Sequence, residues 1–143
     1  MVSTDPFALF ATIIFIFPMV YFSFATPTFF LADFNDPVST KLLRDLFNVY
    51  FRVVAAVGSI GVTAYAIAGK PIVALGFILL VVLAVFSGRF FVQQMDFRMD
   101  ARDAGDLQAT RSLRRLHVGG MLYNLLQMGS ILVSVPYMMA SAT

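Results

Sequence analysis

The stretch 111-RSLRRLHVGGMLYNLLQ-127 decides the fold of this chain, because a charged surface segment turns into a membrane helix within it. It opens with three arginines, carries the only histidine, His117, and continues through Gly119-Gly120. No charged residue occurs from Val118 to the last residue. An apolar stretch of about 20 residues is long enough to cross a bilayer as a helix. This segment therefore predicts the start of a transmembrane helix over residues 112–140.

The composition of the whole chain agrees with a membrane protein. Of its 143 residues, 59% are hydrophobic and 13% are charged, whereas soluble domains carry about 25% charged residues. Cysteine and glutamate are absent and there is one histidine, so most nucleophilic and acid–base chemistries lack their groups. The net charge of +2 is small and the basic residues are clustered, which suits membrane orientation and not nucleic-acid binding.

Three further stretches are apolar for long enough to predict membrane helices. The second is strictly uncharged only over residues 53–69, so Arg52 lies inside that helix, where its side chain can reach toward the interface. Residues 6–32 are uncharged, and we expect this first helix to be retained because no positive segment precedes it, as a secretory signal requires. Pro18 should kink it, and Thr26-Pro27-Thr28 should loosen its end. The four predicted helices cover residues 7–31, 46–69, 72–94 and 112–140. The predicted fold class is an all-α, integral membrane four-helix bundle, formed by a single domain over residues 1–143.

The segments between the helices carry turn signals. Asn35-Asp36-Pro37 predicts a turn, after which Ser39 or Thr40 could cap a following helix. Gly69-Lys70-Pro71 predicts a tight turn, because proline is tolerated in the first turn of a helix. Residues 95–111 form the longest charged stretch and are expected to be a connector between the third and fourth helices.

One face of the second helix is polar. Asp45, Asn48, Arg52, Ser59 and Thr63 recur near helical spacing, with the small residues Ala55, Gly58 and Gly61 in the same region. Small and weakly polar residues let membrane helices approach closely. We therefore expect this face to point into the bundle.

Positive residues are unevenly distributed between the two predicted sides of the membrane. The two longer connectors hold Lys41, Arg44, Arg98, Arg102, Arg111, Arg114 and Arg115, whereas the opposite side has only Lys70. Cytoplasmic loops of membrane proteins are enriched in lysine and arginine. We expect both connectors to be cytoplasmic, both termini to lie on the non-cytoplasmic side, and the membrane to be a bacterial inner (plasma) membrane.

Three stretches of the chain resemble a family of four-helix membrane proteins. They are FATPTFFLAD (24–33), LFNVYFRVVAAVGSI (46–60) and LRRLHVGGMLYNLLQM (113–128). They are similar to the Pro-x-x-Phe segment, the second helix and the Leu-His signature of the group labelled domain of unknown function 4149, related to the transmembrane-protein-205-like proteins. The resemblance implies a four-helix membrane fold. It also implies that His117, Asn124 and Arg52 match recurring positions, without giving them roles.

His117 is the sharpest candidate for a chemical role. It shares one stripe of the last helix with Met121, Asn124 and Met128. Histidine and methionine can ligate haem or a soft metal. One histidine supplies only one strong ligand, so we favour a histidine near the interface that bonds a backbone carbonyl or an aspartate.

Arginines at the cytoplasmic ends of three helices form a second candidate site. Arg52, Arg89 and Arg114 lie at the cytoplasmic ends of their helices. The residues close to them in depth are Asp45, Asp96, Asn48 and Gln93. Ionisable residues inside a membrane are candidates for function by default, so a polar pocket for an anionic headgroup or small substrate is one interpretation. Ion pairs between helices and arginines that reach toward lipid phosphates are the interpretation we favour, because all three lie near the interface. The predicted ligand-binding residues are Arg52, Arg89, His117, Asn124 and Asn48.

Three aspartates share one helix face at the start of the charged connector. Asp96, Asp100 and Asp103 could attract a divalent cation, since carboxylates suit hard metals. Their spacing extends over two helical turns, so we assign no metal site. A solvated face, or a face that docks the basic residues of a partner, is the preferred interpretation.

The sequence leaves three classes of function. We favour a non-catalytic accessory or assembly subunit that packs against other membrane proteins or itself, because catalytic groups are lacking and the connector is charged. The first alternative is a small transporter or lipid- or amphiphile-binding protein with a cytoplasmic-side arginine and histidine pocket. The second is a haem- or quinone-binding membrane oxidoreductase that uses His117. No catalytic residue is assigned, and the cofactor stays open, with haem an alternative that we do not favour.

Overall fold

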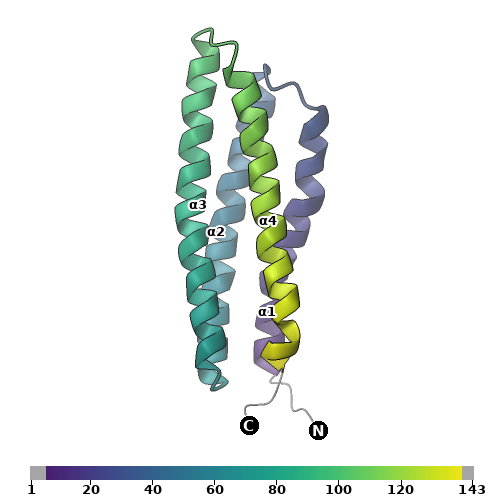
Figure 1. Ribbon diagram of the computed structural model, residues 1–143, viewed down its shortest axis with the longest axis vertical. Coiled ribbons are helices and arrows are strands. Elements are labelled where there is room, and N and C mark those ends of the chain that lie inside the picture. Colours follow the sequence, from purple (N-terminus) through teal and green to yellow (C-terminus); the bar gives the residue numbers. More distant parts are fainter. Residues whose placement is uncertain (1–5, 140–143) are drawn as a thin grey trace.

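A computed structural model describes residues 6–139 and shows four long helices and one short 3-10 helix (Figure 1). They are α1 (Pro6–Ala25), η1 (Thr26–Leu31), α2 (Pro37–Ile67), α3 (Pro71–Asp103) and α4 (Ala109–Met139). Four stretches, one in α1 with η1 and one in each of α2, α3 and α4, are long and apolar enough to cross a membrane. The predicted all-α, four-helix architecture is confirmed.

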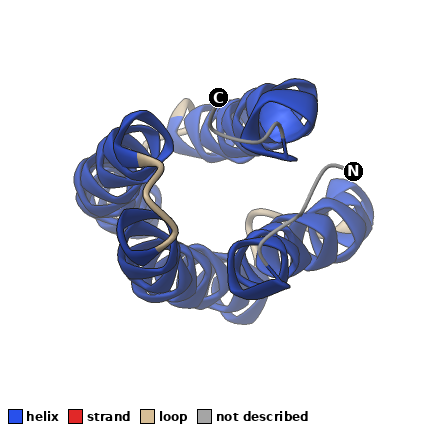
Figure 2. Ribbon diagram, turned by 90° about the horizontal axis from the view of Figure 1, so that it is seen from below, coloured by secondary structure: helices blue, strands red, loops and turns tan. Residues whose placement is uncertain are grey.

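The helices alternate in direction and pack in chain order. α2 and α3 share the most extensive contact, and α1 and α4 also meet, so the row of helices curves round on itself (Figure 2). The first residue of α1 and the last of α4 lie at the same end as the α2–α3 turn (Figure 1). We call this end, with residues 68–70, the turn end. The opposite end holds residues 32–36 and 104–108 and is called the connector end.

Helix α2 starts before the predicted membrane span at residue 46 and continues into it, as the sequence suggested, but its first residue is Pro37. Asp36 caps it: the carboxylate accepts hydrogen bonds from the backbone N–H groups of Val38 and Ser39, both at 3.1 Å. The Ser39 hydroxyl donates a third bond at 2.7 Å. This side-chain bond and the two backbone bonds hold the pKa of Asp36 below its usual range. The proposed caps at Ser39 and Thr40 are wrong, since both residues lie inside α2.

Helix α3 continues to Asp103, past the predicted end at residue 94. The stretch 95–103 contains no glycine or proline, so nothing interrupts the helix. Most of the predicted connector is therefore helical, and the connection to α4 is residues 104–108. Glycines with positive φ make both sharp connections, Gly69 (70°) between α2 and α3 and Gly105 (96°) between α3 and α4.

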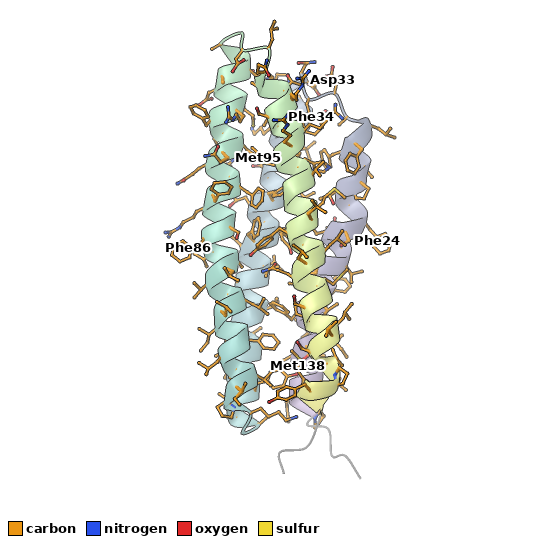
Figure 3. The ribbon with its side chains drawn as sticks, viewed as in Figure 1. Phe24, Asp33, Phe34, Phe86, Met95 and Met138 are labelled. Atoms are coloured by element: carbon orange, nitrogen blue, oxygen red, sulfur yellow. The ribbon has the colours of Figure 1, made fainter. Side chains whose placement is uncertain are left out.

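Aromatic side chains fill the interior. Phe34 and Met95 lie among the helices, whereas Phe24 and Phe86 point away from the bundle (Figure 3). The buried positions of α2 follow helical spacing: Leu43, Phe47, Tyr50, Phe51, Val54, Gly58, Gly61 and Tyr65. Glycines on this stripe admit neighbouring side chains, since a Cβ at Gly61 would lie 2.5 Å from the ring of Phe77. Close packing of α2 on α3 depends on such positions.

The expectation that the polar face of α2 points into the bundle is wrong. Arg52, Ser59 and Thr63 are exposed on its outer side, as is Asp45, and Asn48 is half-buried. These residues lie about two positions from the buried stripe, and two residues turn a helix by about 200°. In a bilayer close packing, and not removal of apolar area from water, holds helices together. The aromatic stripe takes the inner side because its rings pack against those of α1 and α3, as Phe47 does on Phe22 and Phe51 on Phe91.

Candidate functional site

The structure divides the five predicted ligand-binding residues between two places. Asn48, Arg52 and Arg89 line a groove on the outside of α2 and α3. His117 and Asn124 are buried inside the bundle, against α1 and η1. The described residues therefore hold no single pocket that combines these arginines with the histidine.

The α2–α3 groove has a volume of about 440 Å³. Its lining residues are Asn48, Phe51, Arg52, Ala55, Ala84, Val85, Gly88, Arg89, Val92 and Gln93. No carboxylate lines it, and among the described residues neither Arg52 nor Arg89 forms an ion pair. At about 1.5 Å per residue, these arginines lie about 23 and 27 Å from the turn end, near the edge of a hydrocarbon layer of about 30 Å. The groove thus presents two uncompensated positive charges at the border of the bilayer core.

His117 is enclosed by phenylalanines. Its side chain has 0% exposure, and its ring centre lies 5.0 Å from that of Phe30, 6.0 Å from Phe34 and 6.3 Å from Phe29. Neither ring nitrogen has a hydrogen-bond partner among residues 6–139, so the expected bond to a carbonyl or an aspartate is not formed there. Leaving a buried polar group unbonded costs about 1–3 kcal/mol. A ligand could reach either nitrogen only if a phenyl ring moved aside.

The described residues place no cluster of histidine, cysteine or carboxylate ligands at His117. No group of three or more histidine, cysteine, aspartate or glutamate side chains within residues 6–139 is placed to hold a metal ion. A haem would also need space beside the imidazole, where the three phenyl rings now pack. The surroundings of His117 are those of an aromatic core.

Asn124 holds three helices together. Its side chain is 1% exposed, accepts a hydrogen bond from the Tyr50 hydroxyl at 2.5 Å, and donates to the Met19 carbonyl at 3.1 Å and the Ser23 hydroxyl at 2.7 Å. These partners belong to α2 and α1, so the amide links both to α4. With its donors and acceptor engaged, Asn124 acts in packing.

Two of the three aspartates proposed for docking are engaged within the chain. Asp96 receives two hydrogen bonds from the Arg44 guanidinium, at 2.8 and 3.0 Å. Asp103 lies 2.8 Å from the guanidinium of Arg102. Asp100 is exposed and forms no ion pair with a described residue. The acidic face is therefore partly used to join α2 to α3.

Arg102 is a structural residue that sequence reasoning missed. Its side chain is 7% exposed and donates to the Phe34 carbonyl at 3.0 Å and the Thr40 hydroxyl at 2.7 Å. These bonds fasten the end of α3 to the connection between η1 and α2. An arginine in a charged stretch resembles a solvated residue, so the sequence carries no local signal for this role.

Two further polar residues, Tyr123 and Gln127, lie on α4 within the predicted span. The Gln127 amide donates to the Tyr123 hydroxyl at 2.9 Å, and Gln127 is buried. Their spacing of four residues in an otherwise apolar stretch could have identified them as a pair.

Comparisons with known protein families, with curated proteins and with solved structures returned no match. Membership of the family that the chain resembles in three short stretches stays a prediction.

Proposed function

We propose that this chain is a small, non-catalytic membrane subunit that packs sideways against another membrane protein through the α2–α3 groove. The observation that carries the proposal is the position of Asn48, Arg52, Arg89 and Gln93 on the outside of the bundle. In a membrane the outside of the bundle faces either lipid or a partner protein. Ionisable side chains in membrane helices rarely face lipid tails and usually face the interior of a bundle or a water-filled cavity. A partner that covers the groove removes that conflict.

Not every exposed polar residue of α2 needs a partner. The Ser59 hydroxyl donates to the Ala55 carbonyl at 2.8 Å, and the Thr63 hydroxyl donates to the Ser59 carbonyl at 3.2 Å. Hydroxyls bonded to their own helix are tolerated in lipid. The demand for a partner therefore rests on the two arginines, which lie in one groove without a carboxylate.

The chemistry of the groove specifies the partner. Two positive charges near the hydrocarbon edge are best matched by a transmembrane helix that carries an aspartate or glutamate at the same depth, because charge-assisted hydrogen bonds are strong where water is scarce. Ala55, Ala84 and Gly88 line the groove, and small residues let a second helix approach closely. The long aliphatic stems of the arginines can flank such a helix.

A second candidate function follows from the same two arginines. A groove of about 440 Å³ with two unpaired guanidinium groups and two amides also suits the phosphate of an anionic lipid. In that case the chain is a lipid-binding protein and its partner is the bilayer. The third hypothesis, an oxidoreductase that uses His117, has no comparable support, because the imidazole is enclosed by phenyl rings.

We also infer that the connector end is cytoplasmic and that the membrane is a bacterial inner membrane. Positive residues gather near the connector end, where the arginines of α3 and α4 and the lysine of α2 lie. The turn end has a single lysine, Lys70. Positive residues are retained on the cytoplasmic side. Both termini would then be non-cytoplasmic. Cysteine substitutions at Leu107 and Gly69, with labelling by a membrane-impermeant maleimide, test this orientation.

Native mass spectrometry from the host membrane in mild detergent tests the main proposal. We expect the chain in a complex of fixed stoichiometry with a second membrane protein. Arg52→Gln with Arg89→Gln should dissociate that complex. Arg98→Gln with Arg115→Gln, which removes the same charge outside the groove, should leave it intact.

Three results would count against a partner subunit. They are a monomer with no partner, equal loss of the complex in both double variants, or a partner that binds the groove variant as well as the unaltered chain. A monomer that carries anionic lipid, and loses it in the groove variant alone, would support the lipid-binding alternative instead.

A further inference from the structure

A second groove lies between α3 and α4 in the half of the bundle near the turn end. Its volume is about 550 Å³, within the range of about 300–1,000 Å³ typical of small-molecule sites. The α3 wall is apolar and includes Phe77, Leu79 and Leu83. The two grooves face different directions on α3. Leu83 lines the α3–α4 groove and Val85 lines the α2–α3 groove, and two residues along a helix are about 200° apart around its axis.

The α4 side of the α3–α4 groove mixes apolar and polar residues. Its apolar members are Leu126, Ile131 and Met138, and its polar members are Tyr123, Gln127, Ser130, Ser134 and Tyr137. The Ser130 and Ser134 hydroxyls donate to carbonyls of their own helix, at 2.8 and 2.7 Å, so they need no further partner. No charged residue lines the groove. A largely apolar groove with tyrosines and one glutamine suits a neutral molecule with few polar groups.

Gln127 lines this groove and carries a buried polar atom without a partner among the described residues. The residue is 6% exposed, its amide nitrogen donates to the Tyr123 hydroxyl, and its amide oxygen has no hydrogen-bond partner among residues 6–139. The nitrogen and oxygen of an amide can be exchanged by a flip, but either way one end stays unpaired. The residue lies about 17 Å from the turn end, near the middle of a layer of about 30 Å, where water is scarce.

Tyr123 closes the groove toward the connector end. Its hydroxyl accepts the hydrogen bond from the Gln127 amide at 2.9 Å. The terminal torsion of a glutamine side chain has a broad energy profile, so the free end of the Gln127 amide can turn toward the groove.

We propose that the α3–α4 groove binds a neutral lipid that carries a hydroxyl group, with its apolar chain along α3 and its hydroxyl bonded to Gln127. A hydroxyl can both donate and accept, so it satisfies either end of the amide. A charged headgroup is excluded at this depth by the cost of burying charge in hydrocarbon. The site is independent of the α2–α3 groove and of the subunit role proposed for it.

Photolabelling in phosphatidylcholine nanodiscs tests the proposal with two probes, a diazirine derivative of 1-hexadecanol and a matched diazirine alkane without the hydroxyl. We expect the alcohol to label α3 and α4 peptides that line the groove about three- to tenfold more strongly than the alkane, as one hydrogen bond in a membrane predicts. Gln127→Leu should reduce labelling by the alcohol to that of the alkane. Gln93→Leu, in the α2–α3 groove, should have no effect.

Equal labelling by the two probes, or unchanged preference in Gln127→Leu, would overturn the proposal and leave the groove as a contact for ordinary lipid tails. Gly76→Leu provides a second variant if Gln127→Leu does not fold. A Cβ at Gly76 would meet nothing within 4 Å, and the residue lines the groove, so leucine there should fill it without displacing a neighbour. Unchanged labelling by the alcohol in this variant would also overturn the proposal.

Discussion

Gly120 is the position at which a single methyl group tests the packing of the bundle. A Cβ atom there would lie 2.0 Å from Cε1 and 2.3 Å from Cζ of the Phe47 ring, whereas ordinary van der Waals contact begins at 3.4 Å. At the preceding residue, Gly119, the nearest atom would be 3.9 Å away, on Phe91. The two glycines are therefore a matched pair, because alanine must displace a ring at one and has room at the other.

The loss of stability expected in Gly120→Ala depends on how tightly the Phe47 ring is packed. Its ring is fully buried, with its centre 5.0 Å from that of Phe22 and 5.6 Å from that of Phe91. Overpacking a well-packed core costs about 1–3 kcal/mol, while exchanging glycine for alanine in a helix stabilises both variants by about 1 kcal/mol. We expect Gly120→Ala to be less stable than Gly119→Ala by about 1–3 kcal/mol, and Gly119→Ala to be at least as stable as the unaltered chain.

Unfolding of the purified variants in mild detergent, titrated with sodium dodecyl sulfate and followed by far-ultraviolet circular dichroism, measures this difference. Phe47→Leu should restore part of the stability lost in Gly120→Ala, because the shorter side chain removes the collision. If both alanine variants unfold at the same detergent fraction, α2 and α4 do not approach as closely as described and the reasoning fails.

Three further predictions concern polar groups. Asn124→Leu should lower the free energy of unfolding by about 1–3 kcal/mol in the same titration, since it removes three buried hydrogen bonds. Arg102→Gln should lower the free energy of unfolding by about 1.5–3 kcal/mol, because two buried acceptors lose a charged donor. Arg44→Gln should lower it by less than about 1 kcal/mol, since its ion pair is partly exposed. Equal losses in the two variants would contradict the structural role assigned to Arg102. The lowered pKa of Asp36 means that its cap is fully present above the ordinary carboxyl pKa and is lost as pH falls through the folded value. The protection factor of the Val38 amide hydrogen, which is the intrinsic exchange rate divided by the observed rate at the same pH, should therefore fall at low pH in the unaltered chain. In Asp36→Asn, which caps without titrating, it should stay constant.

The number and type of elements could be predicted from hydropathy and length, because each membrane helix must satisfy its own backbone and be apolar over about 20 residues. The ends could not. Asp36 moves the start of α2 to Pro37, and the stretch 95–103 extends α3, since polar residues are as compatible with helix outside a bilayer as apolar ones are within it. Hydropathy reports where a helix is apolar and not where it begins.

The grouping of the candidate site residues could be predicted only in part. Depth along the helices was sufficient to place Arg52 and Arg89 at one level, and the structure brings both into one groove. Depth says nothing about direction around the helix, so His117 was assigned to the same pocket although it faces η1. Direction depends on which side of each helix the large aromatic residues occupy, and that requires the packing of all four helices.

Polarity alone does not decide which side chains lie inside this bundle. Asn124 is buried because the interior offers three partners that match its amide, two of them on α1 and one on α2. Arg52 carries more donors than the groove can satisfy, and it lies outside. Gln127 falls between these cases, since one end of its amide is bonded and the other is not. Polar groups whose hydrogen-bonding capacity exceeds their partners, whether buried like Gln127 or facing outward like Arg52, are where an external molecule gains most by binding. The further site is therefore placed at Gln127 and the subunit contact at Arg52.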